Sequence, residues 1–201
     1  MNAALIVIDV QESFRQRRSW PAVSNPEVVS QVNRLVAAAR RRGDLVVWVL
    51  HAEPGTGTLF DPARGYVRLI DGLATGDGEP VLVKSSANAF TTTSLQQLLT
   101  ARGIRELVIC GIQTEQCCET TARLAADLGF QVTFVTDATA TFPIPHRDAP
   151  ADRTLAETLA DPRTLPTAEV IGRTEYALAG RFATIRSVAE LVAAADGRTG
   201  S

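Results

Sequence analysis

A cysteine at the start of a predicted helix has the clearest chemical potential in this chain. Residues 111–123 read GIQTEQCCETTAR and follow the apolar run 107–110, so Cys117 is expected in the first turn of a helix, beside the carboxyl end of a strand. Backbone N–H groups and the helix dipole favour an anion there, and the thiolate is the reactive form of cysteine. The pattern therefore indicates a nucleophilic thiol.

Two charged residues lie where a buried parallel strand would not normally carry them. Asp9 interrupts the apolar run 4–10, and Lys84 ends the run 80–84. Burying a lone carboxylate or ammonium group costs several kcal/mol, so two such charges at strand ends indicate mutual pairing in a cleft. Together with Cys117 they provide an acid, a cation and a thiol, which is the composition of a nucleophile-activating set.

The pattern of apolar runs predicts the elements that must position these residues. Short runs rich in Val and Ile, typical of strands buried on both faces, alternate with helical patterns. The runs lie near 4–10, 45–50, 81–84, 106–110 and 131–136, and the helical patterns near 25–42, 92–102 and 115–129. This alternation predicts an α/β fold, an open parallel sheet with helices on both sides. Further on we expect helices near 152–160 and 167–179, a strand near 182–186, a helix near 187–195 and a frayed end at 196–201.

Ligands of open parallel sheets bind outside the carboxyl ends of the strands. Five polar or reactive residues fall at or just beyond such predicted ends: Asp9, His51, Lys84, Cys117 and Asp137. The segment 52–80, rich in Gly and Pro, is long enough to be a functional loop that shapes the mouth of a site.

Composition narrows the class of protein. The chain has 201 residues, 45% of them hydrophobic, and a net charge of -2, which predicts one domain, assigned to 1–195, and no binding of nucleic acid or of anionic membranes. No apolar stretch approaches the ~20 residues that cross a bilayer, and no signal-like segment is present, so a cytoplasmic location is expected. Three cysteines without metal-like spacing do not form a disulfide framework, and reduced thiols are expected.

Several motifs in the same order resemble a known family. They are Asp9-Val10-Gln11, the segment 84–90 with Thr93 and Leu95, the segment 111–122, and Asp137-Ala138, spread over 3–142. In these motifs the chain resembles the isochorismatase-like cysteine hydrolases, which include nicotinamidases and N-carbamoylsarcosine amidases. The form Gly-x-Gln-Thr-Glu-x-Cys looks more similar to the broad cysteine hydrolase branch, which includes streptothricin-hydrolase-like proteins.

The resemblance implies a fold and a set of roles. The fold would be a three-layer, doubly wound sandwich with a mostly parallel six-stranded sheet of order 3-2-1-4-5-6, in which the first and fourth strands are neighbours. Cys117 would be the nucleophile, Asp9 its base and Lys84 the cation that stabilises the ionised cluster. The backbone N–H groups of Gln113 and Cys117 would form the oxyanion hole, with a cis peptide bond before Gln113. A homo-oligomer, dimer or tetramer, is usual in similar proteins.

Other residues have both a structural and a functional interpretation. Candidate substrate contacts are Gln11, Phe14, His51 and Phe142. Gln11 could equally be a turn residue or hold the cluster, the phenylalanines could be core residues, and His51 could be structural. Thr114 and Glu115 are expected to cap the helix, and Asp137 to satisfy loop backbone groups.

The histidine content argues against a metal. Metal-using nicotinamidases place a cluster with two histidines after their second strand, whereas this chain has His51 and Glu53 there and no further histidine until His146. These are too few ligands for a first-row metal site. We therefore expect neither metal nor cofactor, and this difference puts nicotinamide in doubt as the substrate.

The function that the sequence favours is hydrolysis of a small-molecule C–N amide bond through a Cys117 thioester, without a metal. Such a thiol needs either a lowered pKa, in the range of about 3.5–7.5, or a base within reach. Alternatives are a nicotinamidase, an isochorismatase, and, from another class, a redox-sensing thiol protein or a catalytically idle binding domain.

Overall fold

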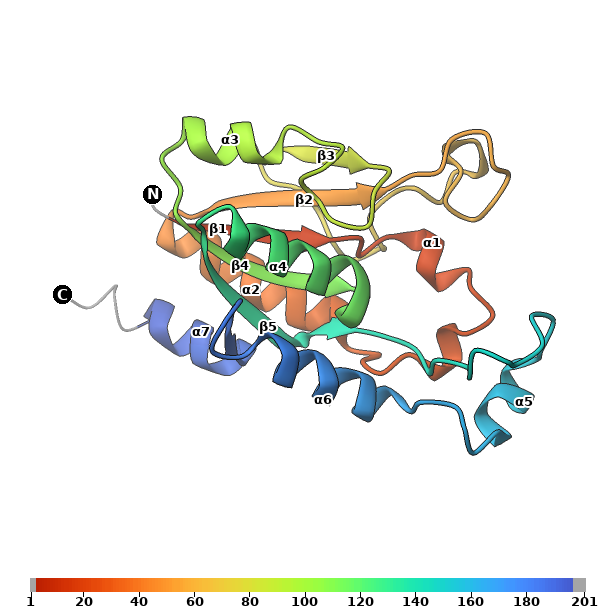
Figure 1. Cartoon of the computed structure of the whole chain (residues 1–201). Coiled ribbons are helices and arrows are strands. Elements are labelled where there is room, and N and C mark those ends of the chain that lie inside the picture. Colours follow the sequence, from red (N-terminus) through yellow and green to blue (C-terminus); the bar gives the residue numbers. More distant parts are fainter. Residues whose placement is uncertain (1–2, 197–201) are drawn as a thin grey trace.

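One parallel sheet forms the centre of the molecule. The computed structural model describes residues 3–196, and Figure 1 shows the strands in the order β3-β2-β1-β4-β5-β6. The strands are β1 Ala3–Ile8, β2 Leu45–His51, β3 Val81–Lys84, β4 Glu106–Ile112, β5 Gln131–Ala140 and β6 Thr184–Arg186. Every neighbouring pair is parallel, so the expected strand order is confirmed and the sheet is parallel throughout.

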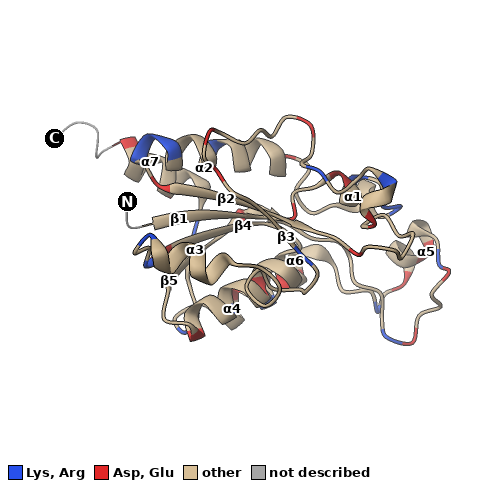
Figure 2. Cartoon of the chain, turned by 90° about the horizontal axis from the view of Figure 1, so that it is seen from above, with Lys and Arg blue, Asp and Glu red and all other residues tan. Residues whose placement is uncertain are grey.

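Helices cover both faces of the sheet, which confirms the three-layer arrangement. The helices are α1 Glu12–Arg15, α2 Val28–Arg42, α3 Leu95–Ala101, α4 Glu119–Asp127, α5 Leu155–Ala160, α6 Thr167–Leu178 and α7 Val188–Asp196. In Figure 2, α2 and α7 lie on one side of the strands and α3, α4 and α6 on the other, while α1 and α5 lie beyond the carboxyl ends of the strands. Short 3-10 turns occur at Trp20–Ala22 and Pro62–Arg64.

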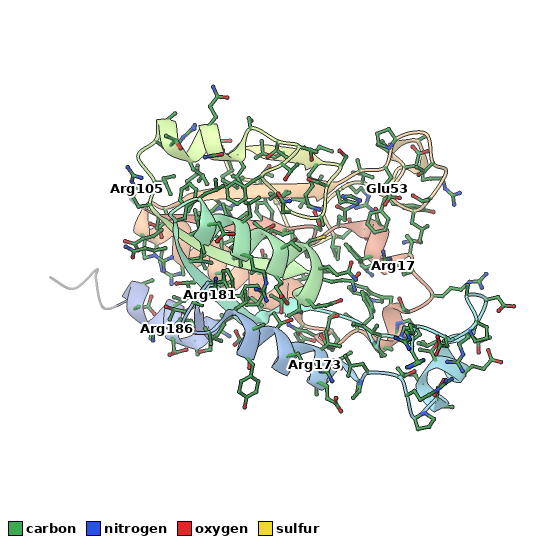
Figure 3. All side chains as sticks on the ribbon, in the orientation of Figure 1. Arg17, Glu53, Arg105, Arg173, Arg181 and Arg186 are labelled. Atoms are coloured by element: carbon green, nitrogen blue, oxygen red, sulfur yellow. The ribbon has the colours of Figure 1, made fainter. Side chains whose placement is uncertain are left out.

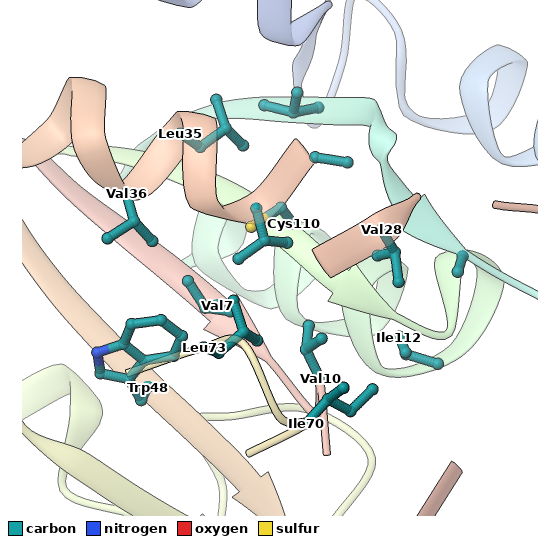
Figure 4. Close-up of a cluster of buried hydrophobic side chains, with 14 of the residues drawn as sticks. Val7, Val10, Val28, Leu35, Val36, Trp48, Ile70, Leu73, Cys110 and Ile112 are labelled. Atoms are coloured by element: carbon teal, nitrogen blue, oxygen red, sulfur yellow. The ribbon is translucent and has the colours of Figure 1, made fainter. Parts of the chain in front are cut away.

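The alternation of side chains along the strands creates two separate cores. Successive residues of a strand point to opposite faces, so Leu5 and Val7 pack toward α2, whereas Ile6 and Ile8 pack toward α3 and α4. On the α2 side Trp48 is completely buried, as Figure 4 shows. Both faces of β1 and β4 are therefore covered, which is why their sequences read as continuous apolar runs.

The structure corrects the predicted elements in two places. The helix expected at 115–129 begins with a turn of π-helix at Thr114–Cys118, and α4 follows it. The strand expected at 131–136 continues to Ala140 through a bulge, where the pairing with β4 shifts between Ile109 and Gly111. Asp137 consequently lies within β5, not beyond its end.

The frayed segment expected at 196–201 lies mostly outside the described residues. Its first residue, Asp196, ends α7. Within 3–196 no helix has both the length and the apolar character needed to span a bilayer.

Gly111 allows β4 to approach β1 closely beneath the site. Its φ is 130°, and a Cβ atom there would lie 1.9 Å from the carbonyl oxygen of Ile8. That contact is with backbone, which cannot rotate away, so Gly111→Ala is expected to lower the free energy of unfolding by more than about 3 kcal/mol. Denaturant unfolding measures the change.

Gly172 in α6 provides a matched control for this substitution. Apart from its chain neighbours and the backbone of its own helix, no atom lies within 4 Å of the position that its Cβ would occupy. Gly172→Ala is therefore expected to leave stability unchanged or to raise it by up to about 1 kcal/mol, because alanine favours helix. Equal unfolding midpoints for the two variants would contradict the close approach at Gly111.

Candidate active site

The carboxylate, ammonium and thiol groups predicted to act together do meet at the carboxyl ends of the strands. Lys84 Nζ lies 2.7 Å from Asp9 Oδ2 and 3.5 Å from Cys117 Sγ. Asp9 follows β1, Lys84 ends β3 and Cys117 lies in the π-turn after β4. Because β3 and β1 flank β2, the lysine side chain must extend past β2 to reach the carboxylate.

Local backbone geometry fixes the direction of the first two groups. Asp9 has a φ of 52°, a left-handed conformation that aspartate tolerates better than most side chains. Its N–H donates to the carbonyl of Val49, which ties the end of β1 to β2. The Lys84 ammonium group also donates to the carbonyl oxygen of Ser86, at 3.1 Å, and both charged side chains are fully buried.

The turn that carries Cys117 is held from both sides. Thr121 donates its hydroxyl hydrogen to the Cys117 carbonyl at 2.6 Å, and the Cys118 N–H donates to the Gln113 carbonyl at 3.1 Å. Cys118 points into the core and is completely buried, whereas Cys117 is half-buried. Of the two adjacent cysteines, only Cys117 faces the charged pair.

Burial controls the protonation of the cluster. It raises the pKa of Asp9, an effect that Lys84 and then Cys117 oppose. It also raises the pKa of Cys117 to about 12, helped by the neighbouring Asp9 charge and opposed by Lys84. A raised pKa favours the protonated thiol, so a nucleophilic Cys117 would need a base within reach.

The Asp9 carboxylate has unused acceptor capacity. No donor within residues 3–196 meets either oxygen of Asp9 with good hydrogen-bond geometry, although Lys84 lies close enough for an ion pair. A buried carboxylate with a raised pKa and a free lone pair is well suited to accept a thiol proton and return it later.

These pKa shifts predict the pH dependence of any Cys117-dependent turnover. Asp9 must be ionised to act as base, so the acid limb of kcat/KM is expected above the ordinary carboxyl range of about 4 and no thiol limb near 8.5 is expected. A raised folded-state pKa for Asp9 means that its contribution to stability is fully present below the unfolded pKa and is lost as pH rises through the folded one. Activity should thus fall on acidification while Asp9 protonation leaves the fold intact. Rates and circular dichroism across the same pH series measure this, and an acid limb at or below 4 would contradict it.

The groups expected to form an oxyanion hole lie next to the thiol. The peptide bond between Ile112 and Gln113 is cis, as expected. In the described part of the chain the Gln113 N–H makes no hydrogen bond, so it remains available to an incoming oxygen. The N–H of Cys117 lies in the same turn, four residues later.

His51 contacts Lys84 of the cluster, and Gln11 holds His51 in place through hydrogen bonds to its backbone. Gln11 is fully buried; its amide donates to Ser13 and to the His51 carbonyl, and it accepts from the His51 N–H at 2.7 Å. Both of its N–H donors are thus occupied. His51 Nδ1 lies 3.4 Å from Lys84 Nζ and its Nε2 lies 3.2 Å from Glu53 Oε1. An ammonium group only donates, so Nδ1 is the acceptor and Nε2 carries the hydrogen.

The two phenylalanines take different positions near a cavity of about 550 Å³. Phe142 lines the cavity with residues from four further segments, including Gln113 and Gln116. Phe14 is buried behind it, with ring centroids 6.3 Å apart, and packs edge-on against Phe60. Cys117 is not among the lining residues, but Gln113 and Gln116 are its neighbours in the π-turn.

The structure shows which roles Thr114, Glu115 and Asp137 have near the site. Thr114 and Glu115 do not cap the helix: Thr114 donates to the hydroxyl of Thr139 in β5, and Glu115 accepts from the hydroxyl of Thr141, the residue that follows β5. That correction reflects the π-turn, which directs both side chains toward the neighbouring strand. Asp137 does satisfy backbone, accepting from the Val188 N–H at the start of α7.

Sequence reasoning missed Arg17 and considered Glu53 only as a metal ligand. Both are charged, both lie at the carboxyl end of the sheet in Figure 3, and both interact electrostatically with the cluster, Arg17 with Cys117 and Glu53 with His51. The only available signal was their position shortly after Gln11 and His51. Within the described residues no group of three or more His, Cys, Asp and Glu side chains could hold a metal ion.

Comparisons with known proteins agree on one relationship. The isochorismatase domain model matches residues 3–164. Nicotinamidase 3 of Arabidopsis thaliana is 36% identical over 154 residues, which are 70% of this chain and 74% of that protein. Streptothricin hydrolase of Streptomyces noursei is 36% identical over 149 residues, 71% of this chain and 51% of that protein. A structure described as a hydrolase of the isochorismatase family, from Chromobacterium violaceum, has a TM-score of 0.84 at 26% identity and covers 98% of this chain and 94% of its own.

Proposed function

The chain belongs to the isochorismatase family of hydrolases, and we propose that it cleaves a C–N amide bond of a small molecule through a thioester at Cys117. The observation that carries this proposal is the buried cluster in which Lys84 lies within 3.5 Å of both Asp9 and Cys117. A thiol, a proton acceptor and a fixed cation are the parts that acyl transfer to sulfur requires.

The first half of the reaction forms the thioester. Asp9 accepts the thiol proton as the Cys117 sulfur attacks the amide carbon, and the carbonyl oxygen becomes an oxyanion beside the N–H groups of Gln113 and Cys117. One such donor contributes about 2.7–4 kcal/mol in other hydrolases. Lys84 keeps a positive charge beside the site as the negative charge moves from carboxylate to sulfur.

The second half releases both products. As the C–N bond breaks, protonated Asp9 donates its proton to the leaving nitrogen, and ammonia or an amine departs. Water then attacks the thioester carbon and gives a proton to Asp9, the C–S bond breaks, and the sulfur recovers a proton. The raised pKa of Asp9 suits both roles, because a group that holds its proton weakly cannot act as an acid at neutral pH.

Two alternatives are less well supported. Nicotinamidase 3 and streptothricin hydrolase are hydrolases, so these relatives do not favour a redox sensor, and the raised pKa of Cys117 argues against a thiolate poised for oxidation. The likeness to nicotinamidase 3 makes nicotinamide a substrate to test, but only one histidine, His51, follows β2.

A panel of amides that includes nicotinamide, measured for ammonia release and by intact mass after rapid quenching, tests the proposal. We expect at least one amide to release ammonia and to leave an acyl group on Cys117. Ammonia release without any adduct on a trapped enzyme, or reversible oxidation of Cys117 with no amide turned over, would contradict the thioester route.

We also propose that residues 1–195 form one domain that works as a homo-oligomer. In support, both core clusters share the single sheet, and the edge strand β3 exposes Val81 and Val83 by 47% and 54%. A single cooperative unfolding transition tests the one-domain statement, and sedimentation tests the homo-oligomer.

A further inference from the structure

An arginine at the mouth of the site lacks the carboxylate partner that Arg153, on the same cavity, has. Three arginines line the cavity: Arg153 is paired with Asp161 at 2.9 Å, Arg18 is exposed, and Arg17 is half-buried. Among the described residues Arg17 has no carboxylate within ion-pair distance. A partly desolvated cation without a counter-ion is costly for a fold, which is a reason to seek a ligand for it.

The guanidinium group of Arg17 is held in one orientation. Its Nη1 donates to the Gln113 side-chain oxygen at 3.0 Å, and its central carbon lies 4.7 Å from the centre of the Phe14 ring and 5.0 Å from that of Phe60. Within residues 3–196, Nε and Nη2 make no hydrogen bond. A planar group fixed by two rings and one hydrogen bond presents its remaining donors at little entropic cost.

The lining of the cavity is positively charged. Burial lowers the pKa of Arg17, while Cys117 and Glu53 raise it, so both lie within its electrostatic range. The cavity lining contains three arginines and neither aspartate nor glutamate. The same lining includes Gln113, whose backbone belongs to the expected oxyanion hole, so a ligand held by Arg17 would extend toward the reacting carbon.

We propose that the amide cleaved here carries a carboxylate, which Arg17 binds through its free donors while the amide carbon faces Cys117. The substrate class is therefore a short amide acid, such as the monoamide of a dicarboxylic acid, and neutral or cationic amides are poor substrates. This inference rests on the proposed function. Arginine is suited to the task because its fork matches the two oxygens of a carboxylate.

Alkylation of Cys117 tests the charge preference before any substrate is known. Iodoacetate and iodoacetamide form the same C–S bond and expel the same iodide, but only iodoacetate carries a carboxylate. We expect Arg17→Gln to lower the rate with iodoacetate, relative to iodoacetamide, by about tenfold, since a hydrogen bond between charged groups contributes on that order. Arg17→Lys should give an intermediate ratio, because it keeps the charge and loses the fork.

Arg15→Gln is the matched control. Arg15 lies two residues away, is exposed and is paired with Glu12 at 3.7 Å, so this variant removes the same charge without touching the cavity. Its ratio of rates should equal that of the parent. An unchanged ratio in Arg17→Gln, or an equal fall in Arg15→Gln, would overturn the inference and leave the thioester mechanism standing. Absence of ammonia release from every amide of the panel would instead remove the proposed function.

Steady-state kinetics separate substrate binding from an effect on the sulfur. With succinamate and its neutral analogue butyramide, the parent should favour succinamate, and Arg17→Gln should erase the preference mainly through KM. An equal loss of kcat for both amides would show that Arg17 acts on the Cys117 thiolate and would overturn the proposal, as would a parent enzyme that favours butyramide.

Discussion

Cys117→Ala is expected to lower kcat/KM for any amide substrate by about 10,000-fold or more, because removal of a covalent nucleophile leaves only binding and the oxyanion donors. The substitution removes one sulfur from a half-buried position. The Cys117 carbonyl is a backbone group, so it keeps the hydrogen bond from the Thr121 hydroxyl after the substitution. Ammonia release and circular dichroism measure the two consequences.

The adjacent cysteine is the matched control for that experiment. Cys118 is completely buried among core residues on the α4 side of the sheet, and burial raises the pKa of its thiol well above the ordinary value. Cys118→Ala should therefore retain most activity and cost about 1 kcal/mol of stability, the transfer free energy of a small apolar group. Equal losses of activity in the two variants would contradict the assignment of the nucleophile.

Asp9→Asn and Lys84→Met should each abolish turnover and each destabilise the fold by about 3–5 kcal/mol, because each leaves a fully buried charge without its partner. The double variant should recover much of the stability, since no unpaired charge remains, but none of the activity. In Lys84→Met the loss of stability should become smaller as the pH falls, because burial already raises the pKa of Asp9 and its carboxyl group then takes up a proton.

Denaturant unfolding of the four proteins gives the coupling free energy, and rate measurements on the same samples give the activity. The design separates structure from chemistry, because stability is expected to recover from the single variants to the double variant while turnover stays absent. Additive stability losses would show that Asp9 and Lys84 do not interact. Restored turnover in the double variant would exclude both from the mechanism.

Most of the fold could be predicted because its signals are local. Runs of Val and Ile marked five strands, and the periodic segments between them marked the helices on both faces. The thiol, carboxylate and ammonium were also apparent, since a polar residue at the end of an apolar run stands out without any knowledge of the fold. Resemblance then supplied the strand order and the cis bond at Gln113.

The errors arose where local preference and tertiary pairing disagree. Thr114 and Glu115 are good helix-capping residues, yet their hydroxyl and carboxylate find partners in β5 and in the residue that follows it, because the π-turn rotates them toward that strand. Asp137 follows an apolar run, but the bulge beside Gly111 lets β5 continue past it. Neither the π-turn nor the bulge can be recognised from the types of these residues alone.

The sequence alone determined which groups are present and which strand each one follows, because burial on both faces imposes a composition that can be read along the chain. Only the tertiary structure decided how those groups act. The contact of Lys84 with Asp9 depends on a side chain that extends past β2. The raised pKa of Cys117 depends on how much water the packed helices exclude. The donors of Arg17 stay free because the fold places no carboxylate within ion-pair distance of them in the described residues. Distances and desolvation belong to pairs of segments far apart in the chain, so no single segment encodes them.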